Sequence, residues 1–111
     1  MKDIIEYPDF AKLDIRIGEI TEVKVPEWSR KLLELTVNFG EEIGERTILS
    51  GIRNWYTPED FEGKKAMFIV NLAERKMGEG VSQGMMLMAD ESEKPLPLFV
   101  PESAALGTVV C

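Results

Sequence analysis

The stretch Leu33-Glu34-Leu35-Thr36-Val37-Asn38-Phe39 alternates without a break between apolar and polar residues. Every odd-numbered position is apolar and every even-numbered position is polar, which is the pattern of a β-strand that buries one face. The stretch therefore predicts a β-strand over residues 33–39, with its odd-numbered side chains in a core.

Two further strands are predicted on either side of this one. Residues 15–25 are rich in β-branched side chains, but their apolar phase slips around Gly18, which predicts a long strand with a bulge or bend there. A glycine-bounded turn at residues 40–44 leads into a third extended segment at residues 46–52. The three segments form a predicted meander.

A short helix and two more strands follow the meander. A capping threonine, a proline at the first helical position, acids in the first turn and a closing glycine predict a helix over residues 57–63. Residues 64–72 and 82–89 predict strands four and five, joined by a loop over residues 73–81. This order predicts an all-β OB-fold, a five-stranded Greek-key barrel with one short helix between strands three and four.

The length and composition indicate one folded domain. The chain has 111 residues, with 44% hydrophobic and 30% charged residues, which is typical of a soluble globular domain. We expect a single domain over residues 1–111, with the barrel at about residues 13–90. No apolar run approaches the ~20 residues that cross a bilayer, and acids interrupt the N-terminal segment, so we expect a cytoplasmic protein with no membrane partner.

The residue types that most enzymes use for catalysis are scarce. The chain has no histidine, and its one cysteine is Cys111, so imidazole bases and Cys/His metal clusters are missing. No set of residues assembles a nucleophile, a base and an oxyanion site. We therefore expect a protein with no catalytic residues, no metal and no cofactor.

The distribution of charge indicates a site for a polyanion. The formal net charge is −7, which repels nucleic acid if it is spread evenly, but residues 63–89 carry four bases and two acids. An OB-fold binds oligonucleotides on strands two and three and with the loops that join strands one to two and four to five. Five cations fall in or beside these places: Arg30, Lys31, Arg53, Arg75 and Lys76. The hypothesis is that they neutralise phosphates.

Aromatic, small polar and methionine side chains near these cations have two interpretations each. Trp28 lies in a polar loop, where packing and ligand contact are equally open, whereas packing is favoured for Trp55 and Tyr56. Ser82-Gln83-Gly84 offers a hydroxyl and an amide that read sugars or base edges, and a plain turn is the alternative. The run Met85 to Met88 indicates a buried strand by default.

Several blocks of the sequence resemble the tRNA-binding domain family, and together they span about residues 9–111. The family includes free-standing dimeric tRNA-binding proteins, domains or subunits of methionyl-tRNA synthetase, and export chaperones of the same fold. The blocks are Asp9 to Gly18, Arg46 to Ile52, Tyr56 to Lys65, Asn71 to Met77 and Ser82 to Leu87. The resemblance implies tRNA contact by Lys76, Ser82 and Met85, with Arg75 beside them. Residues 24–32 depart from the common family pattern.

The resemblance also implies a function and partners. Family members of this length pair through segments outside the barrel, so the apolar segment at about residues 91–111 is expected to form a homodimer. The expected function is structure-selective tRNA binding, either free or in trans with a methionyl-tRNA synthetase catalytic subunit. In this hypothesis Gln83 joins Ser82 and Met85 in meeting sugar or base surfaces. The alternatives are a homodimeric export chaperone that binds unfolded clients and a module that joins synthetase subunits.

Overall fold

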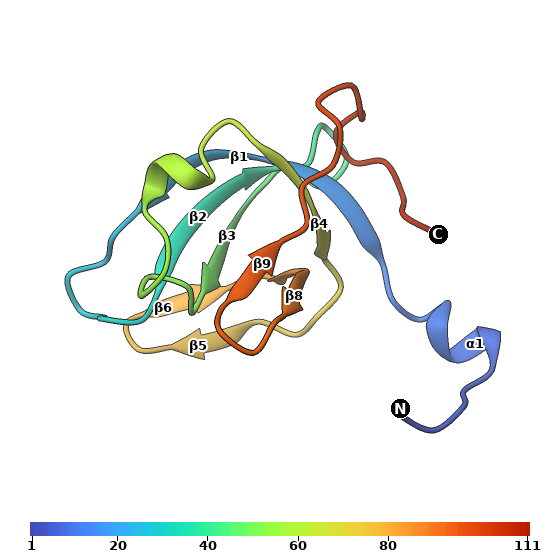
Figure 1. Ribbon diagram of the computed structural model, residues 1–111. Helices are drawn as coiled ribbons and strands as arrows, with labels where there is room; N and C mark the ends of the chain where they lie inside the picture. Colours follow the sequence, from blue (N-terminus) through green and yellow to red (C-terminus); the bar gives the residue numbers. More distant parts are fainter.

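A five-stranded antiparallel sheet forms the body of the computed structural model, which describes residues 1–111 (Figure 1). Its strands are β1 (Ile15–Lys24), β2 (Leu33–Asn38), β3 (Glu45–Ser50), β4 (Lys65–Ile69) and β7 (Met85–Met86). Their order across the sheet is β3-β2-β1-β4-β7, and the sheet curls into a nearly closed barrel. The predicted all-β, OB-like barrel is confirmed.

The long first strand is shared between two neighbours. Residues 15–19 of β1 pair with β4, and residues 19–24 pair with β2, so one continuous strand bends across the barrel. Its bulge lies between Ile20 and Glu22, not at Gly18 where the sequence predicted it. Gly18 marks a close approach instead, because a Cβ there would lie 2.5 Å from Cγ1 of Val37 and 2.7 Å from Cε1 of Phe39.

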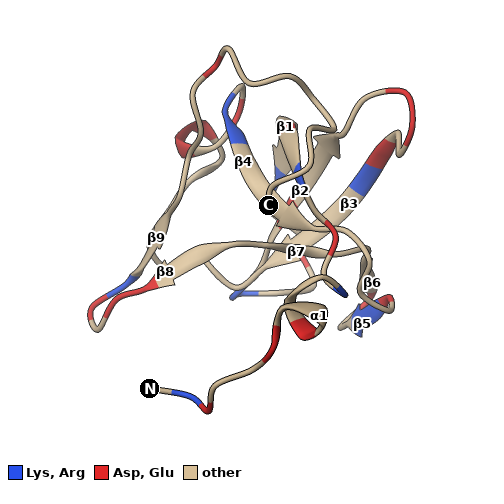
Figure 2. Ribbon diagram, turned by 90° about the vertical axis from the view of Figure 1, so that its right-hand side faces the viewer, with Lys and Arg blue, Asp and Glu red and all other residues tan.

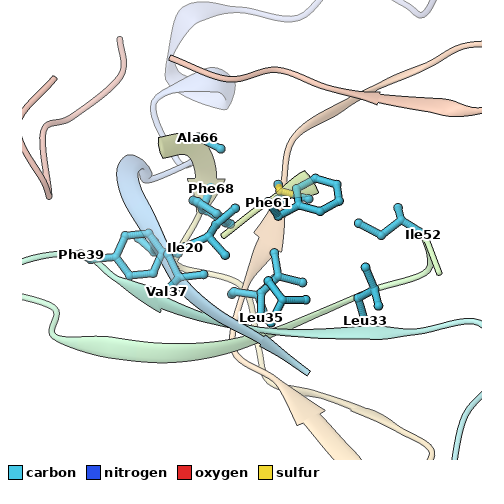
Figure 3. Close-up of a cluster of buried hydrophobic side chains, with 13 residues drawn as sticks. Ile20, Leu33, Leu35, Val37, Phe39, Ile52, Phe61, Ala66 and Phe68 are labelled. Atoms are coloured by element: carbon cyan, nitrogen blue, oxygen red, sulfur yellow. The ribbon is translucent and has the colours of Figure 1, made fainter. Parts of the chain in front are cut away.

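The core lies inside the barrel and is built from alternate residues of the strands (Figure 3). The odd-numbered residues of β2 are fully buried, as their alternation predicted. The rings of Phe39 and Phe68 meet edge to face with centroids 5.3 Å apart, a favourable geometry for two aromatic rings. The cluster comprises Ile20, Val23, Leu33, Leu35, Val37, Phe39, Ile48, Ile52, Phe61, Ala66, Phe68, Val70 and Met86.

The segment between β3 and β4 contains a shorter helix than the sequence predicted. It forms one 3-10 turn, η1 (Pro58–Asp60), whose Thr57 amide donates to the Asp60 carboxylate at 2.8 Å. Phe61 directly after the turn enters the core, and the amide of Gly63 donates to the carbonyl of Ile20 at 2.8 Å. Because the core holds Phe61 and the amide of Gly63 is bonded to Ile20, the helix ends after three residues.

Four short strands complete the chain outside the barrel sheet. The predicted loop at residues 73–81 is a hairpin of β5 (Arg75–Met77) and β6 (Gly80–Ser82), and we call residues 75–82 the basic hairpin. The predicted fifth strand is divided, since only β7 joins the barrel and β8 (Met88–Asp90) pairs with β9 (Pro95–Pro97). A four-residue helix, α1 (Tyr7–Phe10), was not predicted and projects from the barrel with the N-terminal segment (Figure 1).

The C-terminal segment lies along the barrel. The amides of Gly107 and Val110 donate to the carbonyls of Ile17 and Ile15, each at 2.8 Å, so the segment adds to the free edge of β1. Arg16 donates to the carbonyl of Gly107 at 3.1 Å. Hydrogen bonds from Arg16 to the carboxylates of Asp14 and then Glu42 raise the pKa of its guanidinium. No helix is long and apolar enough to span a membrane.

Candidate nucleic-acid interface

A loop and a hairpin that are far apart in the sequence meet at one end of the barrel. The connection from β1 to β2 covers residues 25–32, and together with Lys24, the last residue of β1, it is here called the first loop. The indole of Trp28 lies against the tip of the basic hairpin, with Cζ3 only 2.5 Å from where a Cβ on Gly78 would be. The structure therefore brings together the two connections that the predicted fold assigned to ligand binding.

Cations that have no partner within the protein gather at this end. Seven of the thirteen Lys and Arg side chains are engaged by a carboxylate, a carbonyl or an aromatic ring: Lys12, Arg16, Arg46, Arg53, Lys64, Lys65 and Lys94. Of the other six, only Lys2 lies outside the first loop and the basic hairpin. The five inside are Lys24, Arg30, Lys31, Arg75 and Lys76, all exposed.

The local charge balance at this end is opposite in sign to that of the whole chain. The first loop carries three cations and one acid, and the basic hairpin carries two cations and one acid. Figure 2 shows the cations of β5 in blue at one end of the barrel. A chain with a net charge of −7 thus carries a local excess of three positive charges in these two segments, which favours the approach of a polyanion.

Arg53 is the one predicted cation that the structure places beneath this surface. Its half-buried guanidinium donates to the carbonyls of Pro26, at 3.3 Å, and of Ser29. Its backbone amide also donates to the carbonyl of Lys31 at 3.1 Å. Arg53 therefore holds the backbone of the first loop while Arg30 and Lys31 stay exposed.

Ser82 and Gln83 bond to the outer edge of β3, where no strand is paired. The buried hydroxyl of Ser82 accepts from the amide of Leu49 and donates to the carbonyl of Gly84, both at 3.0 Å. The side-chain oxygen of Gln83 accepts from the amide of Thr47 at 3.0 Å. These bonds satisfy backbone groups that a neighbouring strand would otherwise satisfy, and so they help to close the barrel.

An apolar groove of about 680 Å³ lies next to the basic hairpin, with Arg75 in its wall. The methionine run that was expected in the core is divided here, because Met86 is buried whereas Met85 is 46% exposed. Other apolar lining residues are Leu49, Ile52, Leu72, Met77 and Met88. The groove therefore borders the basic hairpin at Arg75, and its lining also includes the acid Asp90.

Trp55 and Tyr56, two of the three aromatic residues that the sequence singled out, have different environments. Tyr56 packs edge to face on Phe61, with centroids 5.2 Å apart, and its hydroxyl donates to the carbonyl of Pro95 at 2.6 Å, so its predicted packing is confirmed. The packing predicted for Trp55 is wrong, since it is 45% exposed. The backbone amides of Trp55 and Tyr56 both donate to the carbonyl of Ile52, and the turn that they form directs Tyr56 inward and Trp55 outward.

Sequence reasoning missed the contact between Trp28 and the basic hairpin. The signal was present as two glycines, Gly78 and Gly80, which leave a flat space for a ring. It also missed Lys24 as an exposed cation of the same surface. No three His, Cys, Asp or Glu side chains are grouped so as to hold a metal ion.

The comparisons with known proteins agree on one family. The family model for the tRNA binding domain matches residues 15–109. Methionine–tRNA ligase of Paraburkholderia xenovorans is 46% identical over 106 residues, which is 92% of this chain and 15% of that enzyme. The same enzyme of Parabacteroides distasonis is 46% identical over 103 residues, with the same two shares. This chain thus spans about 15% of the length of these relatives.

Solved structures of the same fold cover the whole chain. A MetRS-related protein from Pyrococcus horikoshii matches with a TM-score of 0.92 and 34% identity, over 99% of this chain and 100% of that one. The chaperone CsaA from Bacillus anthracis matches with a TM-score of 0.86 and 25% identity, over 98% of this chain and 100% of that one. From its sequence match over residues 15–109 and its fold, the chain belongs to the tRNA-binding domain family.

Proposed function

We propose that this chain is a non-catalytic, structure-selective tRNA-binding protein whose contact surface is the first loop together with the basic hairpin. The observation that carries the proposal is the gathering of unpartnered cations there, because phosphate contacts supply most of the affinity in sequence-independent binding. A folded RNA is recognised through its shape and its exposed nucleotides, which suits a surface with charge and an apolar groove side by side.

The predicted site residues take two roles in this proposal. Arg30, Lys31, Arg75 and Lys76 contact phosphates, and exposed Met85 offers an apolar surface for a sugar or base. The other three support the same site through their bonds to the backbone: Arg53, Ser82 and Gln83.

We also propose that the protein acts as a homodimer, free or in trans with a methionyl-tRNA synthetase catalytic subunit. The synthetase link is supported by the named relatives, of which this chain matches only a part. The dimer is supported by exposed apolar side chains outside the barrel, with Ile4 at 89%, Tyr7 at 75% and Val109 at 57%. A dimer presents two contact surfaces and gains apparent affinity if one tRNA reaches both.

The test is tRNA binding by charge-removal variants across a salt series. Arg75→Ala with Lys76→Ala is expected to weaken binding at moderate salt and to lower the slope of log K against log salt by about two. Lys2→Ala is the matched control, because it removes an unpartnered cation outside the surface, and it is expected to bind as the wild type does. If the double variant also binds as the wild type does, the site assignment is wrong.

A second function, the binding of unfolded protein clients, is favoured by the apolar groove and by the likeness to CsaA chaperones. The two functions respond differently to salt. Affinity for tRNA falls steeply with ionic strength, whereas apolar client binding persists or strengthens. Titration of total tRNA and of an unfolded client in the same salt series distinguishes them.

A further inference from the structure

The indole of Trp28 fills the space between the first loop and the tip of the basic hairpin. A Cβ on Gly78 would lie 2.5 Å from Cζ3 of the ring, and a Cβ on Gly80 would lie 3.0 Å from Cζ2. Both distances are shorter than the 3.5–4.0 Å of an ordinary carbon contact, so a side chain at Gly78 would clash with the ring and one at Gly80 would push against it. Trp28 itself is only half-buried, so part of the residue remains exposed at the surface.

At Gly80 the close approach of the Trp28 ring can be considered apart from backbone conformation. Gly78 has a φ of +63°, so its backbone conformation alone favours glycine. Gly80 is not among the glycines with positive φ, and the atoms nearest to a Cβ there belong to Leu49 and Trp28, at 3.0 Å each. A side chain at Gly80 would therefore crowd both the indole of Trp28 and the side chain of Leu49.

The basic hairpin needs such support because it is small. Each of its strands has three residues, and two-stranded sheets of this size are marginal in water on their own. At its base the hairpin is held by the bond between the Ser82 hydroxyl and the Leu49 amide. Lys76 pairs with Val81 nearer the tip, where Trp28 provides apolar packing.

The first loop is held independently on its other side. Arg53 bonds the carbonyls of Pro26 and Ser29, and the hydroxyl of Ser29 accepts from the amides of Lys31 and Leu32, each at 3.2 Å. Trp28 therefore projects from a loop whose backbone is held by hydrogen bonds, and its contact with Gly78 and Gly80 restrains the hairpin.

We infer that Trp28 is a positioning residue that holds the cations of the hairpin, Arg75 and Lys76, at a fixed place relative to those of the first loop. This inference rests on the proposed function, since the cations are useful together only for an extended polyanion. A preorganised surface loses less conformational entropy when the ligand binds, so its affinity is higher at the same number of contacts.

The first experiment measures tRNA affinity and its salt slope for Trp28→Ala and Trp28→Phe. Trp28→Ala is expected to bind about tenfold more weakly, from the cost of ordering two long side chains at the interface. It is also expected to have a smaller salt slope, whereas Trp28→Phe retains most of the contact and rescues both values. A loss of affinity with an unchanged slope would mean that Trp28 stacks on the RNA directly, and this would overturn the inference.

A double-mutant cycle separates the two roles further. When Arg75 and Lys76 are already replaced by alanine, Trp28→Ala is expected to cost little additional affinity, because the groups it positions are gone. An undiminished loss in that background would again overturn the inference.

The second experiment uses the free protein and does not depend on tRNA. Amide hydrogen exchange at Met77 and Ser82, which lie in the hydrogen-bonded pairs of the hairpin, is expected to accelerate at least tenfold in Trp28→Ala and in Gly80→Ala, with the core strands still protected. Gly51→Ala is the control, because a Cβ there meets nothing within 4 Å. Unchanged exchange would refute the positioning role, whereas faster exchange in a protein that binds no tRNA would refute only the proposed function.

Discussion

Replacing Gly18 by alanine tests how tightly the barrel closes around its first strand. The new Cβ would lie 2.5 Å from Cγ1 of Val37 and 2.7 and 2.9 Å from two ring carbons of Phe39, both of which are buried. The backbone cannot retreat easily, because Gly18 pairs with Ala66 of β4 on the neighbouring strand. Overpacking of this kind costs up to about 3 kcal/mol, and alanine recovers about 0.5–1 kcal/mol of glycine entropy.

The net expected loss is therefore about 2 kcal/mol in the free energy of unfolding. For a domain of this size that corresponds to a decrease of about 10 °C in the thermal midpoint. The assay is thermal and urea unfolding of the purified variant, with Gly51→Ala as a matched control that is expected to be neutral or slightly stabilising. A Gly18→Ala protein within about 0.5 kcal/mol of the wild type would refute this account of the barrel.

Three other predictions concern the site. Ser82→Ala leaves the amide of Leu49 without its partner and is expected to cost about 1–3 kcal/mol in chemical denaturation; an unchanged midpoint would contradict the closing role of the hydroxyl. With four phosphate contacts, the affinity of the wild type for tRNA is expected to fall about a hundredfold between 50 and 200 mM salt, and a flat salt series would exclude them. The chain has no histidine, which is the side chain that ordinarily changes its charge near neutral pH. The binding constant is therefore expected to be level in that range, and an inflection near neutral pH would contradict the proposed contacts.

The parts of the fold that follow from local periodicity were predictable. The strand at residues 33–39 buries one face, and its alternation alone identifies the side chains that enter the core. The predicted helix at residues 57–63 shows the limit of local signals. Its caps are present, but the burial of Phe61 and the bond from Gly63 to Ile20 end it after one turn.

The candidate site was predictable in its location and not in its internal contacts. The order of the elements placed Arg30, Lys31, Arg75 and Lys76 in two connections of the barrel, and the structure brings these connections together. Which cations stay free depends on carbonyls supplied by distant residues, as for Arg53, and no pattern in the sequence reports such contacts. The basic hairpin was missed because strands of three residues are too short to show a period.

The segment along the free edge of β1 has a consequence for how this protein avoids association. An open strand edge presents unpaired amides and carbonyls on which another chain can add, and proteins commonly cover such edges. Here the cover for Ile15 and Ile17 comes from residues about ninety positions later, so closing it costs more entropy than pairing adjacent strands, and it is expected to form late. Until then the first strand is a template for pairing between molecules, and a protein truncated before Gly107 keeps that template permanently.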